Sequence, residues 1–262
     1  MAPTENRLLD HLKQIVGDVD LSRSPEPDDD RSATASVLKP RFADDYYREQ
    51  SDLYFDTLVS KAPIRQHPKY AHGVVRWEWP PWLLLTGKGR DNMLAIDVLL
   101  KAYPTWCVDR KYRVYDTQPF GRAQVTFHYG HPDARPVPIY EEFTFNDAGE
   151  QTFIEAWSLD DPSLGPRDAD GWPTGPITRM GLRIPGLGSR TSAIDMPALR
   201  AEAAHDPDLA VFLKCYTHPF FEWTDHLMQS IFTKDGTHPD IPHNTLVHRI
   251  LAARQAATAP IS

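Results

Sequence analysis

The stretch IYEEFTFNDAGEQTFIEAW, residues 139–157, decides the fold class of this 262-residue chain. Two runs rich in aromatic and β-branched residues flank Asn146-Asp147-Ala148-Gly149, where glycine accepts the positive φ that a tight turn requires. Runs of this composition on both sides of a short turn are typical of antiparallel strands. We therefore predict a hairpin whose turn is flanked by Asn146 and Glu150.

Counting back from the turn gives a register with an unusual carboxylate pair. Phe143 faces Phe153 and Glu141 faces Glu155, and alternation places these side chains on one face: Ile139, Glu141, Phe143 and Phe145, with Phe153, Glu155 and Trp157 opposite them. Two adjacent carboxylates raise the pKa of one of them, which suits general acid–base catalysis. Two alternatives stay open. Arg110, Arg113 or Arg122 neutralises the pair, or a slip of one residue replaces it with Glu142 and a different partner.

The remaining segments predict an α+β order. Before the hairpin we expect helices at 1–20, from Phe42 to before Pro63 with Asp44 or Asp45 as N-cap, and at 90–102, and then strands at 106–116 and 123–130. After the hairpin we expect a loop rich in Gly and Pro at 160–190 and helices at 196–204, 207–214, 219–233 and 242–257. Helices, then an antiparallel sheet, then helices indicate α+β rather than a doubly wound fold, in which strands and helices alternate.

The segment YRVYDTQPFGRAQVTFHYG, residues 112–130, followed by the acidic and aromatic hairpin, resembles the nuclear-transport-factor-2-like superfamily and in particular its SnoaL-like enzymes. The resemblance implies a cone-shaped α+β domain, in which packed helices and a strongly curved antiparallel sheet enclose a deep apolar pocket. It covers residues 42–160. Residues 1–41 are expected as an N-terminal helix and arm, and residues 161–262 as a loop and C-terminal helical extension packed on the same domain. The proportions also resemble bacterial lyases that remove formaldehyde from lignin-derived diaryl propanoids.

A second segment, VVRWEWPPWLLLTGKGRDNMLAIDVLLKAYP at residues 74–104, supplies candidates for a pocket. It is not a phosphate-binding loop, because it lacks the GxxxxGK[ST] spacing. Its three tryptophans provide apolar surface with N–H donors, either as a wall for a planar ligand or as core packing or an oligomer contact. Arg76 lies between apolar residues, where an unpaired cation is costly, so it should meet a carboxylate or a substrate oxygen.

The candidate site residues form two groups. The candidate catalytic groups, which would hold oxygens or move a proton, are Arg76, Lys88, Asp91, Asp97, Tyr103, Glu141 and Glu155. The candidate substrate contacts are Trp77, Trp79, Trp82, Tyr112, His128, Phe143 and Trp157. Several have ordinary alternatives: a solvated basic turn for Lys88, a helix cap for Asp91, a surface salt bridge with Lys101 for Asp97 and a structural role for His128.

Composition argues against other classes. The net charge is −8 and no long basic run occurs, which disfavours nucleic-acid binding. No apolar run approaches the roughly 20 residues of a membrane span, and we expect no signal peptide. Two widely separated cysteines, Cys107 and Cys215, favour the reduced cytoplasm. Neither an HExxH helix nor a GxSxG elbow occurs, so we expect no metal, no cofactor and no α/β-hydrolase site.

These observations and the resemblance together predict a cofactor-independent lyase. General acid–base groups would cleave a carbon–carbon or carbon–oxygen bond in a hydroxylated aromatic substrate. The resemblance implies a phenolic, lignin-derived substrate that releases formaldehyde. A SnoaL-like cyclase, isomerase or epoxide hydrolase is one alternative, and a non-catalytic protein that binds aromatic ligands is another. We expect a homo-oligomer, dimer or trimer, whose partner is a small hydrophobic aromatic substrate and neither nucleic acid nor membrane.

Overall fold

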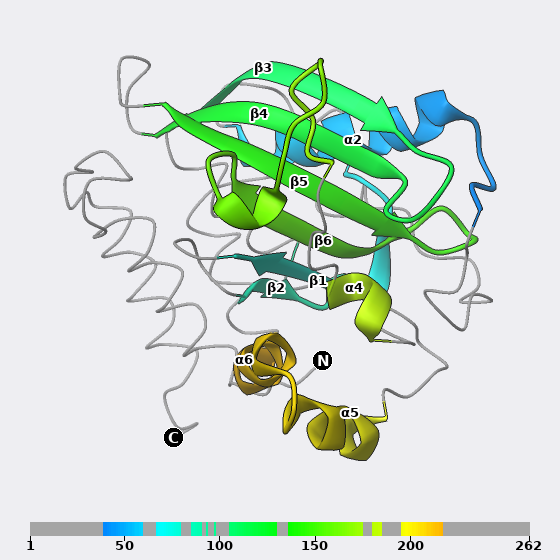
Figure 1. Cartoon of the computed structure of the whole chain (residues 1–262). Coiled ribbons are helices and arrows are strands. Elements are labelled where there is room, and N and C mark those ends of the chain that lie inside the picture. Colours follow the sequence, from blue (N-terminus) through cyan, green and yellow to red (C-terminus); the bar gives the residue numbers. More distant parts are fainter. Residues whose placement is uncertain are drawn as a thin grey trace, which may run out of the picture.

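The computed structural model describes residues 39–59, 67–79, 85–90, 93, 97, 105–129, 136–174, 180–184 and 195–216. These residues form an α+β fold, in which a curved sheet of six strands carries helices on its faces (Figure 1). The coarse prediction of an α+β fold is therefore confirmed. The helices predicted at 1–20, 219–233 and 242–257 lie outside the described residues.

The sheet has the strand order β2-β1-β6-β5-β4-β3. Its strands are β1 (Tyr70–Glu78), β2 (Leu85–Lys88), β3 (Thr105–Val114), β4 (Gly121–Tyr129), β5 (Val137–Phe145) and β6 (Gln151–Ser158). Every neighbouring pair is antiparallel except β1 and β6, which run parallel. The sheet is mixed, so the prediction of a purely antiparallel sheet is wrong. Strand β1 pairs with a segment more than seventy residues later in the sequence, as the register Tyr70–Gln151 shows, and such a pairing leaves no local pattern.

The hairpin β5–β6 has the predicted turn but not the predicted register. The amide of Asn146 donates to the carbonyl of Glu150 at 3.0 Å, and Gly149 has a φ of 78°. Between the pairs Phe145–Gln151 and Thr144–Phe153, β6 carries one extra residue, and this bulge shifts the strand by one position.

The shift separates the two predicted carboxylates. Glu142 pairs with Glu155, whereas Glu141 pairs with Ala156. Because side chains alternate along a strand, a slip of one residue moves a side chain to the other face. Glu141 and Glu155 therefore lie on opposite faces of the sheet, and their predicted pairing is wrong.

Helix α2 (Asp44–Leu58) ends before Pro63, as predicted. Its N-cap is Ala43, with no side-chain cap, so the prediction that Asp44 or Asp45 caps the helix is wrong. Both carboxylates instead lie in the first turn, where negative charge interacts favourably with the helix dipole. Within the predicted helix at 90–102 the structure describes Arg90, Met93 and Asp97, and all three are helical.

Four short elements follow the sheet. They are η2 (Pro162–Leu164), α4 (Met180–Arg183), α5 (Met196–Ala203) and α6 (Pro207–Tyr216). The predicted helices at 196–204 and 207–214 correspond to α5 and α6 and are confirmed. Asp195 caps α5, since its side chain accepts a hydrogen bond from the amide of Ala198 at 3.0 Å.

The two faces of the sheet are covered by different elements. Helix α2 lies behind the sheet in Figure 1, and the segment 159–174 with η2 lies in front of it. We call the side that meets α2 the α2 face; it carries Arg76, Ala123, Glu141, Phe143 and Ile154. The opposite face carries Trp77, Arg122, Glu142, Glu155 and Trp157. Helices α4 and α6 contact β6 and β2, and Phe212 of α6 packs on Trp77 of the opposite face.

The α2 face holds most of the aromatic core. Tyr47 and Phe145 pack edge to face with ring centroids 4.9 Å apart, and Tyr54 and Phe143 do so at 5.3 Å. Aromatic pairs of this geometry stabilise the fold beyond the area that they bury. This packing fixes α2, and with it Tyr54, against the centre of the sheet.

In the described part of the chain, no helix is both long and apolar enough to cross a membrane.

Candidate functional site

The centre of the α2 face holds a buried cluster of one arginine and two glutamates. Arg76 Nη2 lies 2.8 Å from Glu78 Oε1 and 3.4 Å from Glu141 Oε1. All three side chains are less than a tenth exposed. Arg76 and Glu78 share a face because they are two residues apart on β1, and they reach Glu141 of β5 across β6, where Ala156 is the strand partner of both Glu78 and Glu141. The prediction that Arg76 meets a carboxylate is confirmed.

Glu141 stands between two alanines in the sheet. Its cross-strand neighbours are Ala123 on β4 and Ala156 on β6, and both are buried. The row continues beyond these alanines to Tyr112 on β3 and to Glu78 on β1. Glu141 and Glu78 therefore lie in one row, separated by Ala156 alone, on the face that α2 covers.

The surroundings of Glu141 raise the pKa of its carboxyl group to near neutral pH. Burial raises its pKa from 4.5 to about 7, Arg76 opposes the rise, and Glu78 adds to it. The main cause is burial, which penalises the charged form, and the single guanidinium that faces two carboxylates does not cancel this penalty. One of the two carboxylates is therefore easily protonated, and that one is the fully buried Glu141.

Tyr54 of α2 completes this cluster. The Arg76 guanidinium carbon lies 5.6 Å from the centroid of the Tyr54 ring, and the phenol lies near enough to Glu141 to lower the pKa of that carboxyl. The Tyr54 hydroxyl and Glu141 Oε2 are both buried, and neither makes a hydrogen bond within the ranges that the structure describes. Buried polar atoms are almost always hydrogen-bonded in native proteins, so the Tyr54 hydroxyl and Glu141 Oε2 are available to bond to each other, to water or to a polar ligand.

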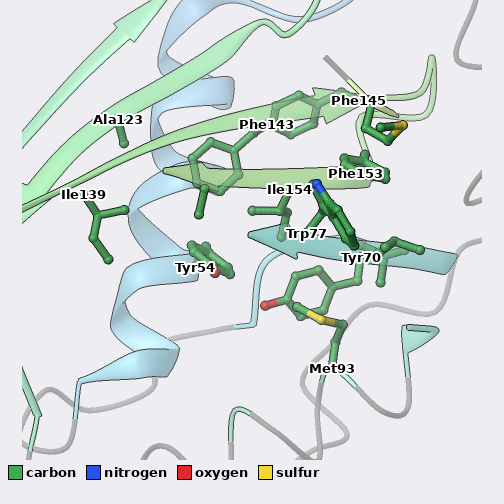
Figure 2. Close-up of a cluster of buried hydrophobic side chains, with 14 of the residues drawn as sticks. Tyr54, Tyr70, Trp77, Met93, Ala123, Ile139, Phe143, Phe145, Phe153 and Ile154 are labelled. Carbon is green, nitrogen blue, oxygen red and sulfur yellow. The ribbon is translucent and has the colours of Figure 1, made fainter. Parts of the chain in front are cut away.

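A second polar cluster lies on the same side of the sheet. Tyr70 at the start of β1 donates from its hydroxyl to Asp97 Oδ2 at 3.2 Å, and His67 Nδ1 lies 3.5 Å from the same oxygen. His67, Tyr70 and Asp97 are all 0% exposed. Figure 2 shows the side chains of Tyr54 from α2 and Tyr70 from β1 below the sheet in this view. The side chains of Ala123 and Ile139 point downwards from their strands in the same view. The electrostatic field of Arg76 acts on both tyrosines, which links the two clusters.

No protein-family model matches this chain, and no curated protein matches its sequence. Among the described residues, no group of three or more His, Cys, Asp or Glu side chains could hold a metal ion.

The opposite face carries its own arginine and two glutamates. Arg122 Nη1 lies 3.5 Å from Glu142 Oε1, and the Tyr140 hydroxyl donates to the same oxygen at 2.7 Å. Burial raises the pKa of Glu155 from 4.5 to about 8, and the neighbouring Glu142 contributes to the rise. Arg122 therefore pairs with Glu142 and not with Glu141 or Glu155, so the alternative that it neutralises the predicted pair is wrong.

Glu155 is a structural group rather than a free acid. Its Oε1 accepts from the amide of Met180 at 2.7 Å and from Trp79 Nε1 at 3.4 Å, and its Oε2 accepts from the amide of Gly181 at 3.4 Å. These donors occupy both carboxyl oxygens and join β6 to α4. Glu155 consequently differs from Glu141, although burial raises the pKa of both.

The predicted aromatic wall lies on the side of the sheet away from Glu141. Trp77 is fully buried against Phe212 of α6 with centroids 5.1 Å apart, and Trp79 stacks with Trp157 at 6.2 Å. Trp77 and Trp157 point to the opposite face because they neighbour Arg76 and Ala156, which point to the α2 face. Core packing, one of the alternatives for the tryptophans of residues 74–104, is therefore what the structure shows for Trp77 and Trp79.

The other candidates divide between the two faces. Phe143 and Tyr112 belong to the α2 face, but the Tyr112 hydroxyl donates to Asp52 at 2.7 Å and is part of the junction with α2. His128 pairs with Trp106 and points away from Glu141. Asp97 is buried, so its interpretation as a surface salt bridge is wrong. Asp91, Trp82, Tyr103 and the side chain of Lys88 lie outside the described residues.

Four residues of the two clusters were not predicted: Tyr54, His67, Tyr70 and Glu78. Glu78 follows Arg76 by two positions and would have been found if β1 had been recognised as a strand. Tyr54 belongs to the apolar face expected for the helix after Phe42, and nothing in that periodicity distinguishes a catalytic phenol from a packing ring.

Proposed function

We propose that this protein is a cofactor-independent lyase in which Glu141 transfers a proton to and from a hydroxylated aromatic substrate bound on the α2 face. One observation carries the proposal. Glu141 is fully buried, has a pKa of about 7, leaves Oε2 without a hydrogen bond in the described part of the chain, and lies beside Arg76. A carboxyl with these properties accepts a proton near neutral pH and returns it.

The neighbours of Glu141 supply the other requirements of acid–base chemistry. Arg76 provides a fixed positive charge that stabilises a developing oxyanion in a water-poor site. Tyr54 offers a phenol that can donate to a substrate oxygen, and burial holds its pKa well above the ordinary value, so the phenol keeps its proton. All three groups are positioned by regular elements, α2, β1 and β5, which keeps their geometry fixed.

The aromatic class of substrate is supported by the ring-rich α2 face and by the resemblance. Phe55, Phe120, Phe127 and Phe143 are buried on this face beside Tyr54. A curved sheet with a helix against one face is also what the nuclear-transport-factor-2-like, SnoaL-like resemblance implies. We therefore propose membership of that superfamily together with the activity.

The concrete reaction is loss of formaldehyde from a diaryl propanediol. Glu141 removes the proton of the terminal hydroxyl, and the oxygen–hydrogen electrons form the carbonyl bond of formaldehyde. The carbon–carbon bond to that terminal carbon breaks, and its electrons form the double bond between the two chain carbons that carry the aryl rings. The benzylic carbon–oxygen bond breaks, and the departing oxygen takes a proton and leaves as water. The products are a hydroxystilbene, formaldehyde and water.

Turnover of 1,2-bis(4-hydroxyphenyl)propane-1,3-diol tests the proposal, with stilbene fluorescence and formaldehyde release as readouts. We expect wild-type turnover that increases as the pH rises through about 7, because the ionised form of Glu141 is the base. Glu141→Gln should reduce the rate on the order of 10²–10⁴-fold. Glu142→Gln, the adjacent buried glutamate of the opposite face, is the matched control and should keep the wild-type rate per folded molecule.

Three results would contradict the proposal in different ways. Full activity of Glu141→Gln removes Glu141 from the mechanism. Consumption of the diol without formaldehyde favours the cyclase, isomerase or hydrolase alternative. Binding of 4,4′-dihydroxystilbene without any turnover of the diol favours the non-catalytic binding protein.

A further inference from the structure

A proton donor for the departing oxygen is the group that the Glu141 cluster leaves unassigned. Hydroxide is a poor leaving group, so elimination from an alcohol is accelerated when an acid protonates the oxygen as the bond breaks. Arg76 does not lose its proton in this pH range, and Glu141 is the base. Burial raises the pKa of Tyr54 well above its ordinary value, so this phenol can donate a hydrogen bond but keeps its proton. The proton donor has to come from another side chain near the same face.

His67 has the environment of such a donor. It is 0% exposed, and neither Nδ1 nor Nε2 makes a hydrogen bond within the described ranges. An imidazole normally satisfies at least one nitrogen when it is buried, because an unpaired polar group in an apolar interior is costly. Imidazole is also the side chain that most readily exchanges protons near neutral pH.

Asp97 and Tyr70 give that imidazole an orientation. Asp97 Oδ2 lies 3.5 Å from His67 Nδ1 and accepts from the Tyr70 hydroxyl at 3.2 Å. A carboxylate beside Nδ1 fixes the orientation of the ring and directs Nε2 away from itself. Tyr70 holds the carboxylate in place, since burial and the negative charge of Asp97 raise its pKa well above the ordinary value and keep the phenol protonated.

The two clusters are neighbours on the α2 face. Tyr70 raises the pKa of Tyr54, Arg76 acts on both tyrosines, and Figure 2 shows the two phenols on the same side of the sheet. The arrangement suits a substrate with two oxygen functions, one for each cluster.

We propose that His67 is the general acid of this site and donates its proton to the departing benzylic oxygen, with Asp97 as its positioning residue. This inference rests on the proposed function. In the balanced step, Glu141 gains the proton of the terminal hydroxyl and His67 loses one to the water that leaves. Exchange of one proton with solvent at each group restores the starting state. The substrate class is accordingly a 1,3-diol rather than a monohydroxylated aromatic compound.

The leaving group provides a test that a structural role of His67 would not satisfy. Acetate departs without protonation, so the benzylic acetate ester of the same diol needs no acid. We expect His67→Gln to slow the diol reaction on the order of 10²–10⁴-fold and to leave the acetate reaction, corrected for the uncatalysed rate, within a few fold of wild type. Glu141→Gln should slow both. His72→Gln, an exposed histidine of β1, is the control and should slow neither.

Each further outcome has a defined meaning. Equal losses on both substrates, or no loss on the diol, overturn the role of His67 and leave the proposed function intact. Absence of diol turnover in the wild-type protein contradicts the proposed function and this inference with it. His67→Asn replaces His67→Gln if the latter does not fold. The wild-type protein offers an independent measurement, because a solvent deuterium isotope effect should be larger for the diol than for the ester.

Discussion

At the scale of single residues, the same charge imbalance occurs on both faces of the sheet. Arg76 faces Glu78 and Glu141 on the α2 face, and Arg122 lies beside Glu142, the strand partner of Glu155, on the opposite face. Burial is the main reason why the pKa of Glu141 rises to about 7 and that of Glu155 to about 8, and the second carboxylate on each face adds to the rise.

This imbalance makes a prediction for stability. The folded protein keeps the proton of Glu155 until about pH 8, whereas an unfolded chain releases it near 4.5. The stabilising contribution is therefore fully present below about pH 4.5 and is lost as the pH rises to 8. One unit of pKa corresponds to about 1.4 kcal/mol. Urea unfolding at pH 5 and pH 8 should show a smaller loss of stability for Glu155→Gln than for wild type, and equal losses would contradict the raised pKa.

At the scale of elements, the junction between α2 and the sheet decides where Tyr54 lies. Arg110 Nη1 of β3 lies 2.9 Å from Asp52 and 2.8 Å from Asp56 on α2. At the start of the helix, the Tyr46 hydroxyl donates to the carbonyl of Gly149 at 2.7 Å. The β5–β6 turn is thus a docking point for α2 as well as a connection between strands.

A comparison of Gly149 in this turn with Gly171 in another turn distinguishes the contact with α2 from the backbone requirement of the turn itself. Gly149 and Gly171 have φ of +78° and +82°, but a Cβ at Gly149 would lie 2.6 Å from the Tyr46 hydroxyl oxygen, whereas one at Gly171 would meet nothing within 4 Å. Gly171→Ala should cost only the strain of about 1–2 kcal/mol. Gly149→Ala should cost clearly more in urea unfolding. Equal costs would show that contact with α2 adds nothing to the turn.

At the scale of the whole molecule, α2 and α6 pack on opposite faces of the sheet and have different roles. The Glu141 cluster lies towards α2, and α6 packs on the opposite face through Phe212 and Trp77. The part of the C-terminal extension formed by α6 therefore stabilises the sheet without covering Glu141.

Phe212→Ala tests this division. Phe212 is 1% exposed, so its truncation should cost about 3–5 kcal/mol of folding free energy. The rate per folded molecule on the diol should stay within a few fold of wild type. Val211→Ala, at an exposed position of the same helix, is the control for stability and should change it little. A large fall in the rate of folded Phe212→Ala would place α6 in the site.

The sequence by itself determined the elements whose signals are local. The turn at 146–149, strands β3 to β6 and helices α2, α5 and α6 follow from glycine conformation, alternation and helical spacing. Strand β1 was not predicted from the sequence. Both of its faces are largely buried, so tryptophans and charged residues alternate along it without forming a polar side.

Only the tertiary structure decided which residues meet. One extra residue in β6 turned Glu155 away from Glu141, and the parallel pairing of β1 with β6 placed Arg76 beside Glu141 and the tryptophans behind it. Asp97 likewise meets His67 and Tyr70 from a separate segment, 27 residues after Tyr70. Backbone preferences act over a few residues, whereas the face on which a side chain lies depends on register, and register is set by packing across the whole sheet.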